Sequence, residues 1–238
     1  MSGQIMIRAR RKLWAVFLPF ILLGLLVHFF VPPRHVPWKP LDMDAPIGIA
    51  TKTKLTMISF APSRICLDKL ASANVLEFNM AEPKDGPKKC GWEIAMSMSA
   101  VSNIKFRPSL VTMQCPLMAG GYIWLLEVNR SALKHLGSPL KSVHHAGTYS
   151  CRRQRGNSSG AWSEHAFANA WDITGFELED GRVISVLKDW ESRTTKAKFL
   201  RDVKKSACRV FRVVLSPDFN AAHKDHFHLD QGPSLSCK

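Results

Sequence analysis

The chain has 238 residues, of which 46% are hydrophobic and 22% are charged, which is ordinary for a globular protein. The length suffices for one sizeable domain, or for a domain with an anchor. The net charge of +14 raises the question of nucleic acid. No nucleic-acid-binding module is recognisable and few aromatic residues lie among the basic ones, so we expect no nucleic-acid partner. Two interpretations stay open: a basic surface that meets an anionic cell-wall polymer or lipid headgroups, and a basic surface that is only solvated.

The first thirty residues differ from the rest. The basic stretch RARRK runs into an apolar segment over 13–31, broken only by Pro19, Gly24 and His28. At 1.5 Å per residue, such a segment just crosses a bilayer core of about 30 Å. A cleaved secretory signal is the alternative, but the following VPPRHVPWKP has no A-x-A-like cleavage site. We therefore predict a cytoplasmic basic tail over 1–12, an uncleaved transmembrane signal anchor over 13–31 in the inner membrane, and a C-terminal domain in the periplasm.

The cysteines agree with an exported domain. None of them forms a C-x-x-C pair, which disfavours a zinc ribbon or a thioredoxin-like site. In an oxidising compartment they predict up to three disulfides, without a choice among the possible pairings. The six are Cys66, Cys90, Cys115, Cys151, Cys208 and Cys237.

The first half of the chain predicts a linker followed by the start of the domain. Residues 32–60 are rich in Pro, Lys and Thr and are expected to be a linker, with the domain covering 61–238. A first helix is expected from Ser63, a strand in AMSMSAVSNIKF, and a helix that begins at Pro116. Gly137 is expected to end the next short helical stretch.

The second half gives clearer signals. NAWDITGFEL, EDGR and VISVL predict a hairpin with a turn at Asp180 and Gly181. An amphipathic helix follows in DWESRTTKAKFLRDVKKSACRVF, and RVVLSP and DHFHLD predict two more short strands. Strands and helices without regular β-α-β alternation indicate an α+β domain, with flanking helices on an antiparallel sheet.

The segment HKDHFHLD, residues 223–230, carries the densest group of ionisable side chains. Because alternate residues of a strand share a face, His226, His228 and Asp230 are expected to face a cleft. Phe227 and Leu229 would then pack into the core. Two histidines on one face are a modest signal by themselves, since solvated strand faces often carry them.

A second segment, SEHAFANAWD, strengthens the signal. His165 lies in a loop, and a strand that begins near Asn169 would turn Asp172 away from its apolar neighbours. One aspartate, one histidine and a second histidine from a distant strand make a three-ligand site with a position left for water, as catalytic zinc requires. Imidazole and carboxylate suit Zn²⁺, while iron, manganese and copper stay open.

Taken together, YSCRRQRG, SEHAFANAWDITGFELEDGR, FLRDVKKSACRVF, VLSPDFNAAHKDHFHLD and the final Cys237 resemble the bacterial extensin-like C-terminal domain. That family is similar in turn to the hedgehog and D-Ala-D-Ala metallopeptidase (LAS-type) superfamily. The resemblance implies a fold of that kind and a zinc site made of His165, Asp172 and His228. It also implies that His226 lies beside the catalytic water and that His223 completes an H-x-x-H-x-H pattern seen in murein endopeptidases.

Two further residues enter through this resemblance. The position of the motif's glycine is occupied by Ala168, which a turn with positive φ would strain. Related carboxypeptidases carry an arginine after an equivalent strand, so Arg152 is a candidate for binding a substrate carboxylate. A solvated loop arginine is an equally weighted alternative.

The resemblance implies a function as well. We expect a membrane-anchored, extracytoplasmic zinc hydrolase, a peptidoglycan carboxypeptidase or endopeptidase that cleaves D-Ala-type amide bonds of stem peptides. The alternative is a catalytically inactive, zinc-containing module that binds the cell wall or is structural. The G-x-S-x-G match GNSSG, residues 156–160, lies in the polar loop RRQRGNSSGAWSEH and not between a strand and a helix, which disfavours a serine hydrolase. The oligomeric state does not follow from the sequence.

Overall fold

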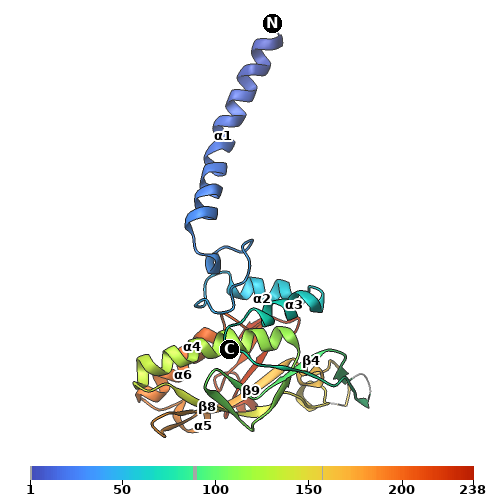
Figure 1. Ribbon diagram of the computed structural model, residues 1–238, viewed down its shortest axis with the longest axis vertical. Helices are drawn as coiled ribbons and strands as arrows, with labels where there is room; N and C mark the ends of the chain where they lie inside the picture. The colour runs from blue at the N-terminus through green and yellow to red at the C-terminus, as the bar shows by residue number, and fades with distance from the viewer. Residues whose placement is uncertain (1, 88–89, 157) are drawn as a thin grey trace.

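The computed structural model describes residues 2–87, 90–156 and 158–238, with side chains from Trp14 onward except that of Arg155. Figure 1 shows a long N-terminal helix that extends from a folded α+β unit. The helices are α1 (Ser2–Phe30), α2 (Thr51–Ser59), α3 (Ser63–Ala71), α4 (Cys115–Leu136), α5 (Val186–Asp189) and α6 (Thr195–Ala207). Short 3-10 turns occur at η1 (Pro33–His35), η3 (Gln154–Gly156), η4 (Glu164–Phe167) and η5 (Ala221–His223).

The strands form one large sheet and two small ones. The large sheet has the order β13-β11-β12-β9-β8-β6-β5, and β10 pairs with β9 outside this path. Its strands are β5 (Ala100–Val101), β6 (Ile104–Arg107), β8 (Leu140–Gly147), β9 (Ala170–Leu178), β10 (Val183–Ser185), β11 (Val213–Leu215), β12 (Phe227–Asp230) and β13 (Ser236–Cys237). The small sheets contain β1 (Asn79–Ala81), β4 (Ala95–Met98) and β7 (Val111–Met113), and β2 (Lys84–Asp85) with β3 (Gly91–Trp92).

The α+β class predicted from the sequence is confirmed, but the large sheet is mixed instead of antiparallel. β6 pairs with β8 in parallel, and so does β11 with β13. The first of these pairs follows from α4, because a parallel pair needs a long crossover and α4 lies between the two strands in the chain. The other pairs of this sheet are antiparallel, including those that join β9 to β8 and to β12.

Helices α4 and α6 supply the apolar layer on one face of the large sheet. Trp124 of α4 packs edge-on against Trp171 of β9, and its indole N–H donates to the carbonyl of Val203 in α6. Phe199 of α6 packs against Phe176 of β9 in the same way. Because successive residues of a strand point to opposite faces, the residues that alternate with these core positions of β9 point to the other face of the sheet.

The predicted hairpin and amphipathic helix are confirmed as β9–β10 and α6. Gly181 in the hairpin turn has a φ of 85°, a conformation that glycine adopts without a steric penalty. Gly137 ends α4 with a φ of 70°, but α4 is a single helix where two stretches were expected. The strand expected in AMSMSAVSNIKF is broken into β4, β5 and β6, with Ser102 in a left-handed turn.

The segment expected to be a linker, residues 32–60, packs into the domain. It contributes α2 and several buried side chains to the same core as α4, namely Leu41, Met43, Ile47, Leu55 and Ile58. The buried Tyr122 of α4 donates a hydrogen bond to the carboxylate of Asp44. Apolar side chains spaced among the prolines and lysines therefore make this segment part of the fold.

The prediction of a transmembrane helix needs correction. Among the helices of the described part of the chain, none is long and apolar enough to cross a membrane. The basic tail predicted over 1–12 lies outside the described side chains.

All six cysteines are paired in three disulfides, as many as the sequence allows. The pairs are Cys66–Cys115, Cys90–Cys151 and Cys208–Cys237. Cys90–Cys151 joins the β2–β3 hairpin to the loop that follows β8. This loop leads to the candidate site.

Candidate metal centre

His165 is positioned by a short turn between two strands. The backbone N–H of His165 donates to the side chain of Ser163, which caps η4. Ala168 then ends the turn with φ 54° and ψ 34°, and β9 begins at Ala170. Ala168 occupies the glycine position of the motif, and it adopts the positive φ that a glycine would favour. Its side chain is fully buried.

Asp172 and His228 are direct neighbours across two strands. They are register partners in the antiparallel pair β9–β12. Trp171 and Ile173 are fully buried on the core side of β9, so Asp172 points to the opposite face. Phe227 and Leu229 are likewise buried beside His228. Two strands and one turn thus bring three side chains together from distant parts of the sequence.

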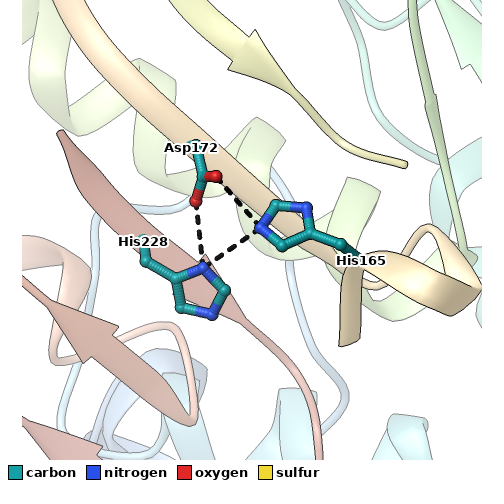
Figure 2. A group of neighbouring side chains, drawn as sticks. All are labelled: His165, Asp172 and His228. Atoms are coloured by element: carbon teal, nitrogen blue, oxygen red, sulfur yellow. Dashed lines mark hydrogen bonds and ion pairs between the residues drawn. The ribbon is translucent and has the colours of Figure 1, made fainter. Parts of the chain in front are cut away.

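The three side chains form a compact triad, shown in Figure 2. His165 Nε2 lies 3.1 Å from Asp172 Oδ2, and His228 Nδ1 lies 2.9 Å from Asp172 Oδ1. The two nitrogens are 3.2 Å apart. Zinc bonds of about 2.0–2.1 Å at the tetrahedral angle would separate two ligand atoms by about 3.3 Å. The triad therefore has the donor set and nearly the spacing of one face of a tetrahedral zinc site.

Each imidazole of the triad is held by an oxygen acceptor on its other nitrogen. His165 Nδ1 lies 3.2 Å from the carbonyl of Thr148, and His228 Nε2 lies 3.0 Å from Asp230 Oδ2. A carbonyl or a carboxylate only accepts, so the N–H of each neutral ring is drawn to that side. In the neutral rings that metal ligation requires, the lone pairs of His165 Nε2 and His228 Nδ1 then face Asp172, whereas a protonated ring would donate to its carboxylate from the same nitrogen.

The electrostatics of the triad favour a positive charge. Burial works against the charged forms, but hydrogen bonds from His165 and His228 lower the pKa of Asp172 far below its usual value. Burial also opposes the charge of His228, but hydrogen bonds to Asp172 and Asp230 raise its pKa to about 9. A ring held between two carboxylates attracts a cation, which is a proton when no metal is bound. Metal binding would release that proton.

His223 and His226 lie beside the triad, at the end nearer to solvent. His226 Nε2 is 3.7 Å from Asp172 Oδ1, and its Nδ1 is 2.8 Å from Asp225 Oδ1. The ring of His223 lies 5.2 Å from that of His226 and 6.0 Å from that of His228. The structure therefore brings together all five histidine and aspartate residues expected at the site.

His223 has a different electrostatic environment from His228. Its Nδ1 lies 2.8 Å from Asn220 Oδ1, which also accepts from the backbone N–H of Ala222. Burial, followed by the charges of His226 and His228, lowers its pKa to about 4. His223 is therefore neutral near pH 7.

Arg152 is near this group without being bonded to it. Its positive charge contributes to the low pKa of His223, and its backbone carbonyl accepts from Ser163. Within the described part of the chain, no hydrogen bond or ion pair joins its exposed side chain to the triad.

Two of the four residues that hold the imidazoles have a signal in the sequence. Asp225 and Asp230 each lie within two residues of the histidine that they contact, so the sequence allows either a surface position or a role in orienting a histidine. Thr148 acts through a backbone carbonyl, which leaves no side-chain signature. Asn220 lies before a short turn whose geometry the strand pattern does not describe.

Comparison with known proteins agrees with the motifs. The family model for the extensin-like protein C-terminus matches residues 64–238. No curated protein and no solved structure gave a match. The matched region contains the triad, both flanking histidines and all three disulfides. The chain therefore belongs to the extensin-like protein C-terminus family.

Proposed function

We propose that this protein is a zinc-dependent hydrolase that cleaves peptide bonds in peptidoglycan outside the cytoplasm. The observation that carries the proposal is the triad of His165, Asp172 and His228, whose donor atoms all lie within 4.8 Å of one another. Hydrogen bonds on the far sides of both rings turn their lone pairs toward Asp172. Such outer hydrogen bonds accompany histidine ligands in metal sites.

A relationship to the hedgehog and D-Ala-D-Ala metallopeptidase superfamily is part of this proposal. It is supported by the spacing S-x-H-x-x-A-x-A-x-D over 163–172 and by H-x-x-H-x-H over 223–228. The residues of both patterns meet in one place in the fold. The proposed substrate, a D-Ala-type amide bond of a stem peptide, rests on this relationship.

In the proposed hydrolysis, the protein's residues have three roles: they bind the metal, accept protons and bind the substrate. His165, Asp172 and His228 would hold the zinc ion, which when bound polarises the scissile carbonyl and lowers the pKa of a water molecule. His226 would take a proton at Nε2, the nitrogen that faces Asp172. His223, neutral near pH 7, would assist as a second acceptor. Arg152, on the loop after β8, would bind a substrate carboxylate.

A periplasmic location is supported by the disulfides, since three intramolecular bridges form and persist in an oxidising compartment. The net charge of +14 is suited to an anionic wall polymer as partner.

Digestion of purified sacculi tests the proposal. The zinc-loaded protein should release products that mass spectrometry of muropeptides identifies as cleaved stem peptides. His226→Ala is the matched control, because it leaves the triad intact. Retention on sacculi without any new muropeptide would contradict hydrolysis and favour a zinc-containing wall-binding module instead.

A further inference from the structure

A hydrogen bond between neighbouring residues holds His226 in the site. Asp225 Oδ1 lies 2.8 Å from His226 Nδ1, and the opposite nitrogen of the ring faces Asp172 Oδ1 at 3.7 Å. The ring is mostly buried, with 17% of the side chain exposed, while the side chain of Asp225 is 52% exposed. Asp225 therefore meets the ring from the solvent side.

The direction of this hydrogen bond sets the tautomer of His226. An ionised carboxylate has no hydrogen to donate, so Nδ1 must carry the N–H. The lone pair of the neutral ring is then on Nε2, which points into the site. Two other groups near the ring are His223, whose centroid is 5.2 Å away, and the carboxylate of Asp172, which faces Nε2. Among the described residues, the hydrogen-bond partner of Nδ1 is Asp225, which therefore fixes this side of the ring.

We infer that Asp225 is a positioning residue, which orients His226 and keeps its Nε2 free to accept a proton. The inference rests on the proposed hydrolysis and adds a residue to it. Without Asp225, the ring would populate the other tautomer, in which Nε2 carries the hydrogen and cannot accept. The ring would also lose the contact that fixes its rotation.

The pair Asp230–His228 can be compared with Asp225–His226, because in both a carboxylate holds an imidazole but only His228 is assigned to bind the metal. There too a carboxylate holds an imidazole, at 3.0 Å, but the ring's free nitrogen belongs to the triad. Loss of Asp230 should therefore weaken metal binding. Loss of Asp225 should leave the metal in place and change only the geometry of proton transfer.

Two substitutions of Asp225 test the inference on the full-length, zinc-loaded protein. Asp225→Ala removes the acceptor, and Asp225→Asn keeps an oxygen that can accept from Nδ1. Asp68→Ala, on the exposed side of α3, is the matched control for loss of a surface aspartate. The readouts are zinc content, kcat and KM on muropeptides, and the ¹⁵N spectrum of the histidine rings, with His226→Ala to assign the signal.

We expect all three variants to keep the zinc content of the wild type. Asp225→Ala should lower kcat by about 10- to 100-fold with little change in KM, as is typical when such an outer partner is lost. Asp225→Asn should recover most of that loss. The His226 spectrum should show hydrogen on Nδ1 in the wild type and in Asp225→Asn, and a mixture of tautomers in Asp225→Ala.

Two results would overturn the inference. An unchanged His226 spectrum in Asp225→Ala would show that Asp225 does not set the tautomer. An Asp225→Asn protein as slow as Asp225→Ala, with the tautomer retained, would mean that the carboxylate itself takes part in the reaction. If the wild type cleaves no muropeptide, the proposed function fails, while the spectra still decide whether Asp225 positions His226.

Discussion

The four histidines of the site form two pairs that are held in different ways. The inner pair, His165 and His228, is fixed by acceptors inside the protein, the carbonyl of the buried Thr148 and the buried Asp230. The outer pair, His223 and His226, is fixed by the exposed side chains of Asn220 and Asp225. Rigid, buried support suits metal ligands, whereas support from the surface suits groups that exchange protons with solvent.

The charges follow the same division. Despite burial, two carboxylates raise the pKa of His228 to about 9, so the inner pair lies where a cation is stabilised. Burial and neighbouring histidines lower the pKa of His223 to about 4, so the outer pair includes a ring that is neutral near pH 7. This difference predicts that substitutions in the inner pair impair zinc binding, whereas substitutions in the outer pair impair turnover and leave zinc bound.

Substitution of an inner histidine should have the largest effect. His228→Ala removes one of three ligands, so we expect zinc to fall from about one ion per chain to a small fraction, and hydrolysis to be lost with it. Metal analysis of the purified variant measures this, with circular dichroism to check the fold. His135→Ala, on α4 away from the site, should keep its zinc. A His228→Ala protein with full zinc would place the metal elsewhere.

Substitution of an outer histidine should separate metal from turnover. His226→Ala should keep zinc near one ion per chain while turnover falls about 10²- to 10⁴-fold, as expected for loss of a positioned proton acceptor. Both quantities should be measured on the same preparation. If this variant loses zinc and His228→Ala keeps it, the roles of the two residues are reversed.

Removal of the inner pair's support should have an intermediate effect. Asp230→Ala leaves His228 Nε2 and the backbone N–H of Gly232 without their acceptor. We expect zinc affinity to fall about 10- to 100-fold. Competition with a chelating dye measures the affinity. A zinc affinity equal to that of the wild type would mean that Asp230 does not orient the ligand.

The smallest effect should come from the turn behind His165. Ala168→Gly relieves a left-handed conformation that costs about 1–2 kcal/mol for a residue with a Cβ, and loses a buried methyl worth about 0.8 kcal/mol. We expect a net gain in unfolding free energy of about 0.2–1.2 kcal/mol, measured by urea denaturation, without a change in zinc content. Ala166→Gly, also buried but outside the left-handed region, should destabilise the protein. A loss of stability in Ala168→Gly would show that the turn is not strained.

Much of the site was predictable because it depends on local periodicity. Alternation along β12 put His228 and Asp230 on one face, and alternation along β9 turned Asp172 away from Trp171. The direct pairing of Asp172 with His228 was not predictable, because register is set by how the strands meet in the sheet. The same holds for the parallel β6–β8 pair, which depends on where α4 returns the chain.

The errors of the sequence analysis near the N-terminus have another cause. Residues 32–60 are rich in proline, lysine and threonine, and this composition hides the separated apolar residues, such as Leu55 and Ile58, that enter the core. Composition is an average over a whole segment, whereas burial depends on which individual side chains pack against the core of the domain. Disulfide pairing was left open for the same reason, since it depends on contacts between distant parts of the chain.

The most direct test of the zinc site is anomalous diffraction at the zinc edge from crystals of the protein grown with stoichiometric zinc. We expect one strong peak at about 2.0–2.2 Å from His165 Nε2, His228 Nδ1 and an oxygen of Asp172. A triad without a peak, or a peak held by other residues, would contradict the metal centre and the hydrolysis proposed from it.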